Sequence, residues 1–159
     1  SMVDQAQALY TQNERRNRRV MLFCAETEAD DLAAQIVADL VEADGYEVFF
    51  GGGGVAWDEV MQEASEQKPD VLLLFSSSGR DAPHIRVLID TIREIGSCPD
   101  MQIVVGGGIF NRAEGLAEEI GADLWATTPT ELIAKLDQEP ERRATPEQRT
   151  VGQQRANAA

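Results

Sequence analysis

Apolar residues gather in five short runs along the chain, separated by polar segments with helical periodicity. The five runs are residues 20–25, 46–50, 71–75, 101–105 and 124–126. A short run that is apolar throughout is typical of a strand buried on both faces, as in a parallel sheet. Between the first two runs, several large apolar residues recur at helical spacing, which predicts that they form the buried face of a helix. They are Leu32, Ile36, Val37, Leu40 and Val41.

This alternation of strands and helices predicts an α/β fold with a doubly wound, five-stranded parallel sheet in the flavodoxin-like order 2-1-3-4-5. The domain is expected to span residues 19–137. A polar arm precedes it at 1–18, and the polar segment 138–159 lacks apolar periodicity and is expected to be a disordered tail. Thr130 is expected to be the N-cap of the last helix.

Small residues follow three of the five predicted strands. They are Gly51–Gly54 after the second strand, Ser76–Ser78 after the third and Gly106–Gly108 after the fourth. In an open parallel sheet, ligands bind outside the carboxyl ends of the strands. Glycines there leave bare backbone, against which a flat or bulky ligand can lie. The pattern therefore predicts a ligand site at this edge of the sheet, between strands one and three.

Composition narrows the range of partners. The chain of 159 residues has 28 acidic and 14 basic residues, and its formal net charge is −14. Nucleic acid and anionic membranes are poor partners for such a surface. There is no apolar run near the 18 residues that a membrane span needs. Two cysteines in an α/β pattern are typical of a reduced, cytoplasmic protein, and Cys24 is expected to be a buried small apolar residue.

Other families of this architecture do not fit the strand ends. A phosphoacceptor receiver needs a carboxylate after strand three and a lysine after strand five, whereas strand three is followed by Ser76 and no lysine directly follows Ala126. A flavodoxin needs a phosphate loop after strand one, where Glu26 and Glu28 would repel a phosphate. The glycines at 51–54 follow strand two and do not form a dinucleotide-binding fingerprint.

The remaining pattern resembles the cobalamin (vitamin B12)-binding domain family over about residues 19–137. Four segments carry the resemblance: 38–48, at the passage from a helix into strand two; 69–78, with the serine motif; Val104–Gly107, with a V-x-G-G motif; and Gly121–Asp123, with a G-A-D motif. The order and spacing of these segments are more specific than any one of them.

The resemblance implies a cobalamin cofactor whose nucleotide tail enters a slot between the strands. Ser76 or Ser78 would hydrogen-bond the base of the tail, and Gly106 and Gly107 would make room for it. Gly108 completes the expected cofactor-binding glycines.

The chain departs from the family at the loop after strand one. The family's motif there is D-x-H-x-x-G or E-x-H-x-x-G, and its histidine binds cobalt. This chain has Asp30 at the histidine position and Ala33 at the glycine position. Glu28, Asp30 and Asp31 are expected to contact the corrin amides or a partner, or else to form a solvated acidic loop. The chain's single histidine, His84, is expected to be a surface residue at a helix entry, or else to approach the corrin from the side.

The resemblance implies a small sensor or regulatory domain that holds a corrinoid without a protein histidine and does not catalyse by itself. Light-sensing repressors and the antirepressors of photosynthesis genes are related families, so a transcription regulator is an expected partner. One alternative is the corrinoid carrier part of a methyltransferase or mutase system, with a methyltransferase subunit as partner. A second alternative is a degenerate protein-interaction module that binds no cobalamin.

Overall fold

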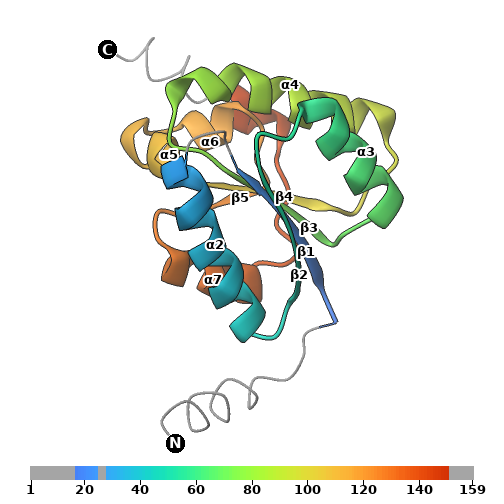
Figure 1. Ribbon diagram of the computed structural model, residues 1–159. Coiled ribbons are helices and arrows are strands. Elements are labelled where there is room, and N and C mark those ends of the chain that lie inside the picture. Colours follow the sequence, from blue (N-terminus) through green and yellow to red (C-terminus); the bar gives the residue numbers. More distant parts are fainter. Residues whose placement is uncertain (1–16, 25–27, 151–159) are drawn as a thin grey trace, which may run out of the picture.

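A parallel sheet forms the centre of the molecule in the computed structural model, which describes residues 17–24 and 28–150 (Figure 1). The strands, in sequence order, are β1 (Arg19–Cys24), β2 (Glu47–Gly53), β3 (Val71–Phe75), β4 (Gln102–Gly106) and β5 (Leu124–Trp125). All the pairs are parallel and the spatial order is β2-β1-β3-β4-β5. The predicted fold class and strand order are therefore confirmed.

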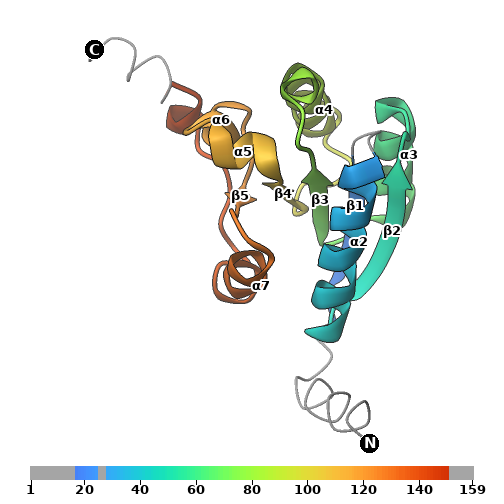
Figure 2. The same cartoon turned by 60° about the vertical axis from the view of Figure 1, so that its left-hand side comes forward.

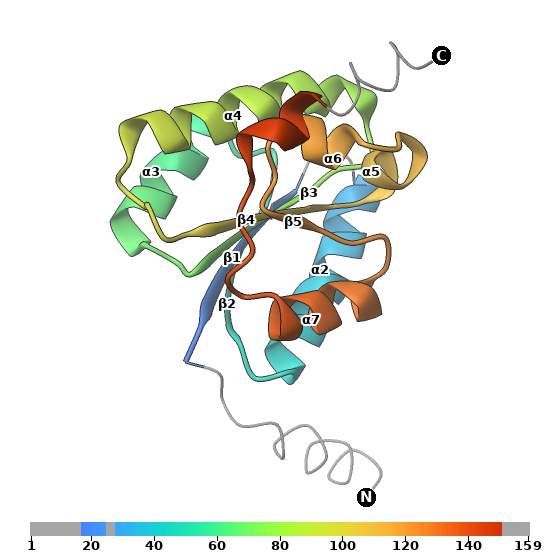
Figure 3. The same ribbon diagram turned by 180° about the vertical axis from the view of Figure 1, so that it is seen from behind.

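Helices cover both faces of the sheet (Figures 1 and 3). The helices of one face are α2 (Glu28–Ala43) and α7 (Pro129–Gln138). The helices of the other face are α3 (Trp57–Gln67), α4 (Ala82–Ile95), α5 (Gly108–Arg112) and α6 (Leu116–Glu119). Figure 2 shows α2 alongside β1 and β2, and α7 below β5. Among the helices in the described part of the chain, none combines the length and apolar character needed to cross a bilayer.

The two cores follow from the alternation of side chains along each strand. In β1, Met21 and Phe23 pack under α3 and α4, whereas Val20 and Leu22 pack under α2 and α7. Neither face of the inner strands meets water, which is why these strands are apolar throughout.

The buried face of α2 differs from the prediction. Its fully or nearly fully buried residues are Ala34, Val37, Ala38 and Val41. Leu32, Ile36 and Leu40, which were predicted to be core residues, are 62%, 52% and 37% exposed. The apolar residues of α2 cover more of its circumference than one helix face can bury, and the small alanines allow the helix to lie close to β1 and β2. The prediction was correct for Val37 and Val41 and wrong for the other three.

Helix α7 begins two residues earlier than predicted, because Thr128 is its N-cap. The Thr128 side chain accepts a hydrogen bond from the backbone N–H of Glu131 at 3.1 Å. Pro129 occupies the first turn, where its fixed φ suits a helix start, and it holds the preceding residue in an extended conformation. The prediction of Thr130 as the cap was wrong because it took no account of this proline.

The first part of the segment predicted to be a disordered tail lies against the domain. Gln102 donates from Nε2 to the carbonyls of Glu139 and Arg142 at 2.9 and 3.1 Å. The Arg142 guanidinium lies 4.4 Å from the centre of the Trp125 ring. Gln148, at the short 3₁₀ helix η2 (Pro146–Thr150), is buried. Polar side chains make these contacts, so the lack of apolar periodicity in this segment could not predict them. Residues 1–16 and 151–159, the arm and the end of the predicted tail, lie outside the described residues.

Candidate ligand site at the carboxyl ends of the strands

The serine and glycine segments that follow β3 and β4 lie side by side. Phe75 pairs with Gly106 in the parallel register. Beyond that pair, the Ser76 backbone N–H donates to the Gly106 carbonyl at 3.0 Å, and the Ile109 N–H donates to the Ser76 carbonyl at 3.4 Å. Two segments 30 residues apart in sequence thus form one continuous edge of backbone at the carboxyl end of the sheet.

Ser76 is buried, and the protein itself engages its hydroxyl. Its side chain donates to Asp81 Oδ2 at 2.6 Å and accepts from the Ser78 N–H at 3.2 Å. The Ser78 hydroxyl accepts from the N–H of Arg80 and caps the 3₁₀ turn η1 (Gly79–Asp81). The segment 76–81 was predicted to line the ligand crevice, but no role was predicted for Asp81, because nothing in the sequence pattern distinguished it from a solvent-exposed acid at a helix entry. A ligand that binds the Ser76 hydroxyl as an acceptor must compete with this carboxylate.

The surroundings require glycine to different degrees at the three positions that end β4. A Cβ at Gly107 would lie 2.2 Å from the Ser76 carbonyl oxygen, and its φ of +109° suits glycine alone. Contact with β3 therefore already accounts for Gly107. Among the described residues, a Cβ at Gly106 would meet only the Ala126 carbonyl oxygen, at 3.9 Å. A Cβ at Gly108 would lie 2.8 Å from the end of the flexible Arg112 side chain, which donates to the Ser77 carbonyl.

Gly106 faces the same side of the sheet as Val104, which belongs to the core under α2 and α7. On that side, Cys24 ends β1 and Phe75 ends β3, and both pack with this core. The glycine thus leaves bare backbone beside these two side chains, and in the described part of the chain no group packs closer to this point than the Ala126 carbonyl.

Asp31, in the first turn of α2, lies beside the ends of β1 and β2. Asp31 accepts a hydrogen bond from Gln35 Nε2 at 3.0 Å, and Cys24 Sγ lies 3.9 Å from its Oδ1. Cys24 is buried, as expected. The backbones of Glu28 and Asp30 form the first turn of α2. Their side chains lie outside the described residues, so their predicted contacts stay predictions.

His84 lies in the first turn of α4 and is exposed, which confirms that it is a surface residue at a helix entry. Among the side chains that the structure describes, which do not include those of Glu28 and Asp30, no cluster of three or more His, Cys, Asp and Glu residues could hold a metal ion. The described side chains therefore show no site for a metal ion bound by the protein alone.

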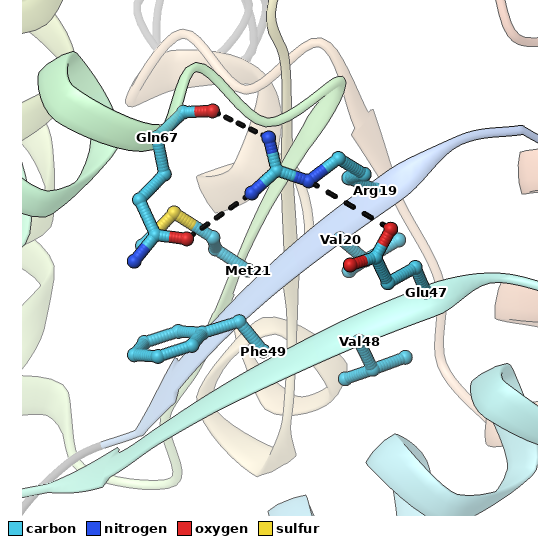
Figure 4. A pocket seen from close by; sticks show the side chains of 7 residues that line it. All are labelled: Arg19, Val20, Met21, Glu47, Val48, Phe49 and Gln67. Atoms are coloured by element: carbon cyan, nitrogen blue, oxygen red, sulfur yellow. Dashed lines mark hydrogen bonds and ion pairs between the residues drawn. The ribbon is translucent and has the colours of Figure 1, made fainter.

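A shallow hollow lies at the opposite end of the sheet, where β1 and β2 begin (Figure 4). Arg19 donates to the carbonyl and the side-chain oxygen of Gln67 at 2.6 and 3.1 Å, and its Nε lies 3.9 Å from a Glu47 carboxylate oxygen. The polar groups that line this hollow thus bind one another, and it lies away from the strand ends. We assign no ligand to it.

Comparison with known proteins agrees with the sequence resemblance. The model of the B12 binding domain family matches residues 18–134. Dimethylamine corrinoid protein 1 of Methanosarcina acetivorans is 27% identical over 110 residues, which are 69% of this chain and 51% of that protein. Trimethylamine corrinoid protein 2 of the same organism is 26% identical over 117 residues, 74% of this chain and 53% of that protein. The chain thus spans about half the length of these relatives.

Solved structures share the fold. A cobalamin-binding protein from Desulfitobacterium hafniense superposes with a TM-score of 0.70 and 21% identity, covering 77% of this chain and 59% of that one. The monomethylamine corrinoid protein of Methanosarcina barkeri gives a TM-score of 0.68 and 20% identity, covering 84% and 61% of the two chains. A chain of the methanol:cobalamin methyltransferase complex from the same organism gives 0.69 and 20%, covering 83% and 50%.

Proposed function

The chain belongs to the B12 binding domain family, and on that basis we propose that it holds a corrinoid at the carboxyl ends of β1, β3 and β4. The observation that carries the proposal is the joining of the Ser76 and Gly106 segments into one edge, with bare backbone at Gly106. When bound, a corrinoid supplies a cobalt centre for ligand exchange or group transfer. The residues of this chain would bind and orient it.

The described residues fit the tail of such a cofactor. Gly106 offers bare backbone, and of the described residues only Ala126 comes within 4 Å of the place a Cβ would take there. Ser76 offers a hydroxyl that could donate to a ring nitrogen once it leaves Asp81. A pocket that is largely apolar and has a few placed polar groups is the usual form of a cofactor site. Gly107 supports the site indirectly, because it lets the Ser76 backbone come close to β4.

The residue at the family's histidine position sets the expected chemistry at cobalt. Asp30 stands there, and the chain's one histidine lies exposed on α4. A carboxylate is a weak match for cobalt in a corrin compared with a neutral imidazole. The corrinoid would therefore bind without a protein imidazole on its lower face. Asp30→His should tighten binding.

A sensor or regulatory role follows as the proposed use of this binding. Without a histidine to tune the cobalt, the domain is better suited to report the presence or form of the corrinoid to a partner such as a transcription regulator. The carrier role is the second candidate, since its relatives include proteins named dimethylamine and trimethylamine corrinoid proteins. In that role a methyltransferase subunit would be the partner.

Titration of the full chain with hydroxocobalamin and adenosylcobalamin, followed by visible absorbance, tests the proposal. We expect saturable binding with a stoichiometry near one. Gly106→Ala should weaken cobalamin more than cobinamide, which lacks the nucleotide tail, and Val87→Ala on the exposed surface of α4 is the matched control. If neither cobalamin binds saturably, we would conclude that the domain is a protein-interaction module that binds no cobalamin.

Electron paramagnetic resonance of the cob(II)alamin complex tests the lower face of the cofactor. We expect no superhyperfine splitting from a protein nitrogen in the wild-type chain, and its appearance in Asp30→His. A nitrogen splitting in the wild type that disappears in His84→Ala would contradict the assignment and place the cobalt ligand on α4.

A further inference from the structure

Arg112 carries an exposed guanidinium that joins the two loops of the candidate site. It is the last residue of α5, and it donates from Nη2 to the Ser77 carbonyl in the loop that follows β3. Its Nη1 lies 2.8 Å from the place that a Cβ would take at Gly108. The guanidinium thus lies against the bare backbone of the glycine segment and bridges it to the serine segment.

The positive charge of this guanidinium is not neutralised by a carboxylate of the described residues. Its hydrogen-bond partner among them is the neutral Ser77 carbonyl. An arginine has five N–H donors in a planar fork, so the group can bind an anion through the other donors while it keeps this bond. Segments 76–81 and 106–112 together contain two basic residues, Arg80 and Arg112. Of these, Arg112 is the one that bridges the serine and glycine segments.

The nucleotide tail of a cobalamin would bring a negative charge to this part of the site. The tail runs from the corrin ring through a phosphodiester to the ribose and the base. With the base at Gly106 and the ring outside the strand ends, as proposed above, the phosphodiester lies between them, at the level of the loops that Arg112 bridges. The chain has a formal net charge of −14, which repels anions, so a phosphate bound here needs a local cation.

We infer that Arg112 binds the phosphodiester of the corrinoid tail and makes the site selective for corrinoids that carry this phosphate. The inference rests on the proposed corrinoid site and names a residue that determines its specificity. Guanidinium and phosphate form charge-assisted hydrogen bonds that are frequently bidentate. Gly108 then serves to give the guanidinium its place, because a side chain at 108 would push Arg112 away from the Ser77 carbonyl.

Three corrinoids that differ only in the tail test this contact. Cobinamide ends before the phosphate, cobinamide phosphate ends at it, and cobalamin carries the ribose and the base as well. The full chain is titrated with each, and binding is followed by visible absorbance. Arg112→Gln should weaken the binding of cobalamin and of cobinamide phosphate roughly tenfold and leave cobinamide unchanged. Arg112→Lys should recover part of the loss, because it keeps the charge but not the planar fork.

Lys68→Gln is the matched control for the loss of one exposed positive charge. Lys68 ends α3 and lies shortly before the first residue of β3, so the length of that strand separates it from the candidate site. Its variant should bind all three corrinoids as the wild type does. Circular dichroism and the urea midpoint establish that the variants fold, which is expected because Arg112 and Lys68 are exposed.

The other outcomes separate this inference from the proposed function. If Arg112→Gln weakens cobalamin but not cobinamide phosphate, Arg112 only positions the serine segment for the base, and the inference is overturned. It is also overturned if cobinamide weakens equally, or if Arg80→Gln and not Arg112→Gln removes the preference for the phosphate. Unchanged binding of all three corrinoids to Arg112→Gln overturns this inference alone. If the wild type binds neither cobalamin nor cobinamide, the proposed function fails and this inference fails with it.

Discussion

Replacing Gly107 by alanine is expected to lower the free energy of unfolding by roughly 3–5 kcal/mol. The residue has φ +109° and ψ 171°, a backbone conformation that other residues occupy only at a cost of about 1–3 kcal/mol. The new Cβ would also lie 2.2 Å from the Ser76 carbonyl oxygen and 2.9 Å from its backbone nitrogen. The two strand ends must then separate.

That separation strains two backbone hydrogen bonds. They join Ser76 to Gly106 at 3.0 Å and Ile109 to Ser76 at 3.4 Å, and each contributes about 1 kcal/mol. Native domains are stable by only about 5–15 kcal/mol, so the sum is a large fraction of the total. The effect should appear as a clearly lower urea midpoint at an unchanged slope.

Urea unfolding followed by far-ultraviolet circular dichroism measures this effect, with Gly106→Ala as the matched control. A Cβ at Gly106 would lie 3.9 Å from the Ala126 carbonyl oxygen, with no closer neighbour in the described part of the chain, and this glycine does not have a positive φ. Its alanine variant should therefore unfold within about 1 kcal/mol of the wild type. If Gly107→Ala unfolds at the same urea concentration as Gly106→Ala, close approach of β3 and β4 is not what requires glycine at 107.

Three further predictions concern stability. Asp123→Ala should cost about 3–5 kcal/mol in urea unfolding, because it leaves two backbone N–H groups and a guanidinium without their buried carboxylate; a cost below about 1 kcal/mol would mean that water replaces it. Thr128→Ala should cost about 1 kcal/mol by removing the α7 cap, and Thr128→Ser should restore most of it. Hydrogen bonds from the Thr127 side chain and then from Lys135 lower the pKa of Glu131 below its ordinary value of 4.5. The stability that Glu131 contributes is therefore complete above pH 4.5 and is lost as the pH falls through the lowered pKa. Because the Glu131 side chain is 37% exposed, that contribution is less than about 1 kcal/mol, and a thermal unfolding series on Glu131→Gln should show a flatter acid limb.

The sequence predicted the sheet well because its inner strands are buried on both faces. Residues 71–75 were placed as a strand with the bounds that the structure gives, and the other strands were placed within a few residues. Helix faces were less predictable, since α2 has more large apolar residues than it buries. The sequence pattern of a helix cannot distinguish an apolar residue that faces the sheet from one on the exposed side of the same helix.

The candidate site was predictable where it depends on backbone and not where it depends on side-chain partners. Strand order alone brings Ser76 next to Gly106, because parallel strands end at the same edge. The hydrogen bond from Ser76 to Asp81 depends on the path of a 3₁₀ turn, which no periodicity reports. Likewise, the sequence does not show that glycine is required at position 107 because the Ser76 backbone lies close to it, and not because a ligand does.

The contacts around the Asp123 carboxylate also determine where the C-terminus of this protein can be truncated. The family match ends at residue 134 and α7 ends at Gln138, yet Ala144 donates to Asp123 at 2.7 Å and Gln148 donates to the Ala122 carbonyl at 2.8 Å. A chain that stopped at either boundary would expose the short edge strand β5 and leave part of this carboxylate's shell unfilled. Uncovered strand edges pair with one another between molecules. A chain cut at a boundary taken from the family profile is therefore expected to aggregate more readily than one that extends through Gln148.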